Sequence, residues 1–127
     1  MKHFKIKSFV REAKKEKISD EKLLKAMINF DNLDDDGKHR YALGGELYKL
    51  RIATKSGSGK SSGSRSILAY KKNNMVYWLH LFAKNDKGNI TTKELSDLKK
   101  IAKLLFGYNE KQLRKLIEDG ILTEIVS

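Results

Sequence analysis

The cationic side chains of this chain gather in one segment. No Asp or Glu occurs from residue 47 to residue 85, whereas eight basic residues lie there: Lys49, Arg51, Lys55, Lys60, Arg65, Lys71, Lys72 and Lys84. A solvated protein surface normally mixes both signs of charge, and a region of one sign attracts a polyanion. The segment therefore predicts contact with phosphate groups, and nucleic acid is the commonest partner of that kind. A patch that serves solubility or binds an acidic protein is the alternative.

A glycine- and serine-rich stretch, Ser56 to Ser64, lies inside this basic segment. Its Gly-Lys-Ser core at 59–61 matches the end of the phosphate-binding loop G-x-x-x-x-G-K-[ST]. The first glycine of that motif would fall on Thr54, and the stretch leads into a predicted strand instead of a helix, so nucleotide hydrolysis is disfavoured. What is left is a loop whose backbone can approach phosphate closely, with Lys60 inside it and Arg65 beside it. A plain hairpin loop is the alternative.

Several other chemistries are excluded or disfavoured by residue type. The absence of cysteine excludes disulfides, thiol nucleophiles and cysteine-ligated metal sites. His3, His39 and His80 have no paired spacing on one face, so no metal site is expected. Residues 32–37 resemble the start of a calcium-binding loop, but the position of its bidentate glutamate falls on Leu43. His80 lies in an apolar run and is expected to be a packed or partly exposed strand histidine instead of a catalytic base.

Three predicted strands must position the basic side chains. The stretch 46–54 alternates, which places Lys49 and Arg51 on one face and apolar residues on the other. The stretches 64–72 and 74–83 are two further strands, joined by a tight asparagine-containing turn. We expect the apolar face of the first strand to pack and its basic face to be exposed, and the three strands to form an antiparallel sheet. Membrane binding is disfavoured, because a basic amphipathic membrane helix needs an apolar face beside its charges.

The N-terminal part predicts a strand and two helices. Phe4 and Ile6 alternate with lysines and predict a short first strand, which a helix follows. A second helix begins after Ser19, a favourable N-cap, and the acidic stretch from Asp31 to Gly37 predicts a loop. The opening residues carry too much charge for a signal peptide, and no apolar window is long enough to span a membrane. We therefore expect a soluble protein of the cytoplasm.

The C-terminal part predicts two further helices. Thr91 and Glu94 form a capping box that begins the first of them, and Asn109 with Gln112 repeats the device for a helix that runs to about residue 120. The last residues, ILTEIV, fit either a short strand or an oligomer contact. With 127 residues, of which 39% are hydrophobic, the chain is long enough to bury a core as a single domain over residues 1–127.

Three stretches considered together carry a family resemblance. They are GGELYKLRIATKSGSGKSSGSR at 44–65, LFAKND at 81–86 and NITTKELSDLKKIAK at 89–103. In their order, spacing and basic character they resemble the RelE/ParE superfamily of bacterial toxin–antitoxin toxins, specifically its RelE and HigB branch. The resemblance covers most of residues 1–105. It implies an α+β fold with a small, antiparallel-rich twisted sheet and helices packed on one face. Residues 106–127 have no counterpart in the family pattern, and we expect them to form an extension with an extra C-terminal helix.

The resemblance also implies a reaction and its residues. Such toxins cleave messenger RNA, usually inside the ribosomal A site, by attack of the RNA's own 2′-hydroxyl on the adjacent phosphate, with neither metal nor cofactor. The protein must then assist proton transfer and stabilise a phosphorane with extra negative charge. Arg65 corresponds to the arginine that closes the glycine-loop strand and is expected to stabilise this phosphate, with Lys84 near it. Arg51 and Lys60 match basic positions that hold the phosphate, and Lys60, crowded by other cations, is also a candidate for proton transfer.

Other cations are expected to contact RNA without taking part in chemistry. Lys49, Lys55 and Lys71 are assigned to the RNA backbone or to ribosomal RNA. Some members of the family use a C-terminal tyrosine as acid or base, and here only Tyr108 lies near that end, beyond the matched helix. The resemblance therefore leaves the general base open.

The expected partners are messenger RNA, the A site of the 70S ribosome, and a cognate antitoxin, which in this family often contains a helix-turn-helix domain. Two other functions are considered beside a type II toxin with endoribonuclease activity. One is a ParE-like protein that binds DNA gyrase, and the other is a noncatalytic nucleic-acid-binding module whose affinity depends on salt. The dense basic cluster around Arg65 favours RNA over gyrase.

Overall fold

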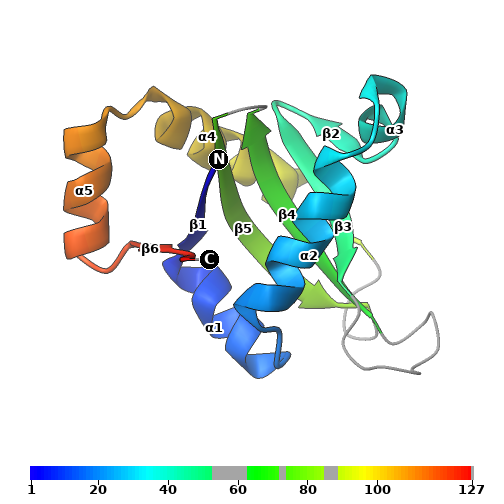
Figure 1. Ribbon diagram of the computed structural model, residues 1–127, viewed down its shortest axis with the longest axis horizontal. Helices are drawn as coiled ribbons and strands as arrows, with labels where there is room; N and C mark the ends of the chain where they lie inside the picture. The colour runs from blue at the N-terminus through cyan, green and yellow to red at the C-terminus, as the bar shows by residue number, and fades with distance from the viewer. Residues whose placement is uncertain (53–62, 72–73, 85–88, 127) are drawn as a thin grey trace.

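The computed structural model of the protein describes residues 1–52, 63–71, 74–84 and 89–126 (Figure 1). Its elements follow in the order β1 (Lys2–Ile6), α1 (Lys7–Lys15), α2 (Asp20–Asp31), α3 (Asp35–His39), β2 (Ala42–Gly44), β3 (Leu47–Ile52), β4 (Ser64–Lys71), β5 (Met75–Ala83), α4 (Thr92–Gly107), α5 (Glu110–Glu118) and β6 (Leu122–Glu124). The three predicted central strands are confirmed as β3, β4 and β5.

The six strands form one sheet in the order β2-β3-β4-β5-β1-β6. The pairs between β2 and β3, β3 and β4, β4 and β5, and β1 and β6 are antiparallel, whereas β1 lies parallel to β5. The expected α+β class and the antiparallel-rich sheet are thus confirmed. The parallel strand β1 separates the predicted meander of β3, β4 and β5 from the C-terminal strand.

Helices cover both faces of the sheet, where the resemblance had implied one (Figure 1). On one face, Phe9 of α1 and Leu23 of α2 share a buried cluster with Trp78. On the other face, Leu98 of α4 shares a second cluster with Tyr77. Neighbouring strand residues point to opposite faces, so adjacent aromatic residues belong to different cores. The runs ILAY in β4 and VYWL in β5 are apolar without alternation, and such strands need cover on both sides.

The predicted helix starts are confirmed by their hydrogen bonds. The Ser19 hydroxyl accepts from the Lys22 backbone N–H at 3.3 Å. Thr91 and Glu94 make both halves of a capping box at the start of α4. Asn109 caps α5 in the same way. The loop expected between residues 31 and 37 is interrupted by the short helix α3.

The C-terminal extension completes the sheet. The last strand, β6, pairs antiparallel with β1, with Leu122 opposite Ile6. Leu113 of α5 and Leu122 are both buried in the cluster on the α4 face. Of the two alternatives for the final residues, the structure therefore has the short strand, and α5 ends at Glu118, before the predicted residue 120. The extension covers the β1 edge, far from β3.

Candidate functional site

Two arginines face each other across the sheet. Arg51 of β3 lies directly opposite Arg65 of β4, which in turn lies opposite Phe82 of β5. Paired residues of antiparallel strands have Cα atoms about 4.5–5.5 Å apart and side chains on the same face. Like charges in such a pair destabilise a sheet, and an anion that binds both guanidinium groups relieves that repulsion. The pair is therefore an arrangement suited to a phosphate.

The Lys84 backbone and the Arg51 side chain both lie next to Gly63. The Gly63 carbonyl oxygen accepts a hydrogen bond from the Lys84 backbone N–H at 3.3 Å. A Cβ built on Gly63 would lie 3.0 Å from the Nε of Arg51, which is tighter than most Cβ contacts in proteins. The Arg51 side chain thus lies across the glycine, and Arg51, Arg65 and Lys84 lie together at one end of the sheet.

Arg65 is half-buried and retains hydrogen-bonding capacity. Its Nη1 is shielded from solvent and has no hydrogen-bond partner among the described residues. A buried polar group without a partner costs about 1–3 kcal/mol, so such groups occur where a ligand completes the interaction. A guanidinium offers two parallel N–H donors, a geometry that suits a phosphate.

The other predicted cations divide into three groups. Lys49 lies two residues before Arg51 on β3, with its Nζ 3.4 Å from the Asn89 side-chain oxygen. Lys71 is at the opposite end of β4, about 20 Å from Arg65 along an extended strand, and its Nζ lies 5.1 Å from the centre of the Phe106 ring. The structure therefore brings Lys49 near the arginine pair and does not bring Lys71 there. Lys55 and Lys60 lie outside the described residues.

His80 is confirmed as a packed, partly exposed strand histidine. Its side chain also contacts two glutamates, which the sequence analysis did not predict. Its side chain is 20% exposed, and its Nδ1 lies 2.9 Å from the Oε2 of Glu12. The other Glu12 oxygen accepts the Leu81 backbone N–H at 3.1 Å. The His80 Nε2 is 3.9 Å from the Oε2 of Glu94. Nothing in the sequence links a histidine and a glutamate 68 positions apart, so this contact was not predictable.

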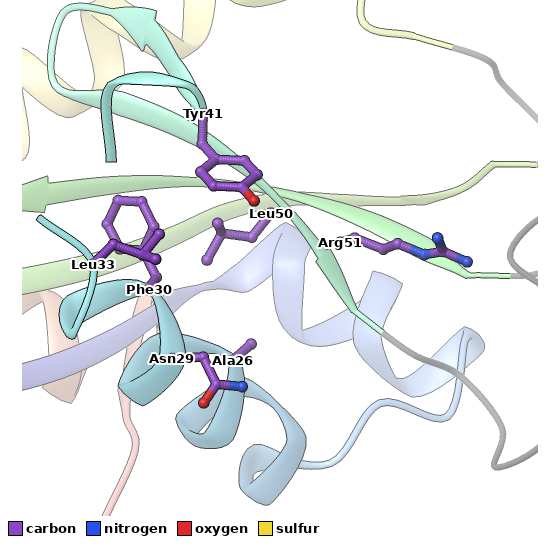
Figure 2. Close-up of a pocket in the computed structure, with 7 residues that line it drawn as sticks. All are labelled: Ala26, Asn29, Phe30, Leu33, Tyr41, Leu50 and Arg51. Atoms are coloured by element: carbon purple, nitrogen blue, oxygen red, sulfur yellow. The ribbon is translucent and has the colours of Figure 1, made fainter. Parts of the chain in front are cut away.

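The opposite face carries a pocket between α2 and β3. Figure 2 shows its lining, with the Tyr41 ring above Leu50 and the Arg51 side chain extending away from the pocket. The cavity measures about 260 Å³ and is lined by Ala26, Asn29, Phe30, Leu33, Tyr41, Leu50 and Arg51. Its walls are mostly apolar, in contrast to the arginine pair, so it offers little to a phosphate.

Two features are absent from the described residues. No group of His, Cys, Asp or Glu among them is arranged to hold a metal ion. None of the helices in the described ranges has the length and hydrophobicity needed to cross a membrane.

Comparison with known proteins gives one family match. The family model described as RelE toxin of the RelE/RelB toxin–antitoxin system matches residues 1–125. It extends well past residue 105, where the resemblance drawn from the motifs had ended. No curated protein matches the chain. Because the match covers nearly the whole sequence, the chain belongs to the RelE toxin family.

Proposed function

We propose that this RelE family toxin is a ribosome-dependent endoribonuclease that cleaves messenger RNA by 2′-hydroxyl attack. The observation that carries the proposal is the cross-strand pair of Arg51 and Arg65, with Lys84 beside it. Three cations at one end of a sheet can stabilise a phosphorane, because it carries more negative charge than the phosphodiester from which it forms. Stabilisation that is stronger in the transition state than in the ground state accelerates the reaction.

Each cation has a distinct part in this proposal. Arg65, half-buried and with an unused donor at Nη1, binds the phosphate that is attacked. Arg51, held across Gly63, binds the same phosphate from the neighbouring strand. Lys84, next to Gly63, adds a third positive charge near the phosphate. Lys60 is our predicted contributor to proton transfer, and Lys49, Lys55 and Lys71 are our predicted contacts to RNA backbone. No metal or cofactor takes part in these steps.

The proposed partners follow from charge and family. A formal net charge of +11 favours association with the polyanionic ribosome and its messenger RNA. A toxin of the RelE family has a cognate antitoxin, and we propose that this antitoxin contains a helix-turn-helix domain and that it covers the basic face or blocks entry into the 70S A site. The proposed compartment is the cytoplasm, where translating ribosomes are found.

The test measures single-turnover cleavage of messenger RNA bound in programmed 70S ribosomes. Arg65→Ala should slow cleavage about 100- to 1,000-fold, because removal of one preorganised transition-state donor has that effect. The matched control is Lys111→Ala, which removes an exposed cation of α5 to which the proposal assigns no role, and which should change the rate less than about threefold. Equal losses in both variants would indicate unspecific charge attraction, as in a noncatalytic binding module.

Mapping of new RNA 5′ ends after a pulse of the protein in bacteria distinguishes the remaining alternative. Cuts at fixed codon positions that Arg65→Ala abolishes are expected. Growth arrest with DNA damage and without new RNA ends would instead indicate a ParE-like gyrase inhibitor and would contradict the proposal.

A further inference from the structure

Strand β5 is longer than its neighbour β1. The parallel pairing runs only from Lys2 opposite Met75 to Lys5 opposite Trp78, whereas β5 continues to Ala83. Beyond Trp78 this edge of β5 therefore lies past the paired part of β1. The carboxylate of Glu12, on α1, occupies the edge, because its Oε1 accepts the Leu81 N–H at 3.1 Å.

The second oxygen of the same carboxylate contacts His80. The Nδ1 of His80 lies 2.9 Å from Glu12 Oε2, so Glu12 is held between a backbone donor and an imidazole. An ionised carboxylate accepts hydrogen bonds and does not donate them. The hydrogen bond therefore places a proton on Nδ1 and leaves the lone pair of a neutral ring on Nε2.

A register shift in β5 lies next to this histidine, on the side away from the arginine pair. Ile67 lies opposite His80 while Leu68 lies opposite Trp78, so one residue of β5 is extra and the strand bulges there. Bulges of this kind redirect side chains and are frequent beside active sites. Because Arg65 lies opposite Phe82, His80 is its diagonal neighbour on the same face, with Cα atoms about 7–8 Å apart.

Two polar atoms of this diagonal pair lack partners. The Nε2 of His80 and the Nη1 of Arg65 are both shielded from solvent and make no hydrogen bond within the described part of the chain. Glu94, in the first turn of α4, covers Nε2 at 3.9 Å, a distance longer than a hydrogen bond. Its other oxygen is occupied by the Thr91 N–H. A substrate hydroxyl that displaces this loose contact would reach Nε2.

We propose that His80, oriented by Glu12, is the general base of the RNA cleavage reaction. This assignment rests on the proposed function. The His80 Nε2 takes the proton of the 2′-hydroxyl while the 2′-oxygen forms a bond to phosphorus. The bond from phosphorus to the 5′-oxygen breaks, and that oxygen takes a proton from water, which leaves a 2′,3′-cyclic phosphate and a 5′-hydroxyl end. Arg65 binds the phosphate oxygens throughout, and Glu12 stabilises the imidazolium that forms, as a carboxylate does in catalytic triads.

The first experiment compares variants in single-turnover cleavage on programmed 70S ribosomes across pH 5.5–9. His80→Gln, which cannot accept the proton, should lower the rate about 100- to 10,000-fold at neutral pH with little change in messenger RNA binding. It should also remove the pH dependence contributed by the base, whose charged neighbours are Glu12, Glu94 and Arg65. His39→Gln, at an exposed histidine of α3, is the matched control and should cleave at the wild-type rate.

Two further measurements make the result decisive. Glu12→Gln should lower the rate less than His80→Gln and shift the pH profile, whereas a purely structural contact would lower stability and leave the profile unchanged. Nitrogen-15 NMR of the wild-type protein should find neutral His80 protonated at Nδ1. The inference is overturned if the wild type cleaves and His80→Gln cleaves within about threefold of it, or if the neutral ring carries its proton on Nε2. A wild type that does not cleave on the ribosome removes the proposed function, and the role of His80 with it.

Discussion

Replacement of Gly63 by alanine tests how the arginine pair is positioned. The new Cβ would lie 3.0 Å from Arg51 Nε, 3.6 Å from Arg51 Cγ and 3.3 Å from the Ile52 carbonyl oxygen. Non-bonded heavy atoms are most stable about 3.5–4.0 Å apart, so the Nε must retreat by about 0.5 Å or more. Arg51 is exposed, so its side chain has solvent into which it can rotate outward. We therefore expect the fold to persist and the guanidinium to leave its position opposite Arg65.

The expected loss in activity follows from that displacement. A misplacement of about 1 Å can reduce a reaction rate about 100-fold, so about 0.5 Å corresponds to about tenfold slower cleavage on programmed ribosomes. Stability should change by less than about 1 kcal/mol, because the lower entropy of the unfolded alanine chain offsets the crowding at Ile52. Gly107→Ala is the matched control, since a Cβ there meets nothing within 4 Å. It should leave cleavage unchanged.

A double-mutant cycle decides whether Gly63 acts through Arg51. In the Arg51→Ala background there is no guanidinium to displace, so Gly63→Ala should slow cleavage by less than about twofold. If Gly63→Ala still costs tenfold in that background, the steric explanation is refuted and the glycine affects the site in another way.

Three further predictions concern stability and are measured by urea denaturation. Thr91→Ala removes the α4 cap and should lower the free energy of unfolding by about 1 kcal/mol, whereas Thr91→Ser should retain most of it. Lys38→Met leaves the carbonyl oxygens of Asp31 and Leu33 without the buried Nζ that donates to both, which should cost about 1–3 kcal/mol. Burial lowers the pKa of His3, so the unfolded chain takes up its proton first and stability should fall as pH decreases below about 6.5. His3→Gln should make the free energy of unfolding less dependent on pH in that range.

Local signals in the sequence predicted most of the secondary structure. The caps at Ser19, Thr91 and Asn109 are correct because a capping side chain bonds to backbone only three residues away. The alternation of β3 is correct from residue 48 to residue 52, where Leu50 and Ile52 are buried and Arg51 is exposed, whereas Leu47, on the same face as Arg51, is buried in the cluster on the α4 face. The apolar runs of β4 and β5 are typical of strands covered on both faces, a signal that our expectation of helices on one face did not use.

The pairing of the strands was harder to predict from the sequence, because it depends on residues far apart in the chain. A period of two tells which face a residue occupies and says nothing about which strand lies beside it. The parallel placement of β1 beside β5 and its antiparallel pairing with β6 join residues from the two ends of the chain. Local sequence patterns therefore could not predict that the C-terminal extension covers β1.

Part of the candidate site could also be predicted from local sequence patterns, and part of it depends on contacts between distant residues. The arginines at 51 and 65 stood out because their charge segregation is visible in the sequence, and the register of β3 and β4 then placed them opposite one another. His80 did not stand out in the sequence, because its proposed role depends on its contact with Glu12. That contact forms where β5 extends past β1 and bulges. Cations that bind phosphate can be recognised from composition, whereas a proton acceptor needs a partner that fixes its tautomer. The sequence left the general base open for this reason, and our proposal for it, His80, depends on the packing of α1 against β5.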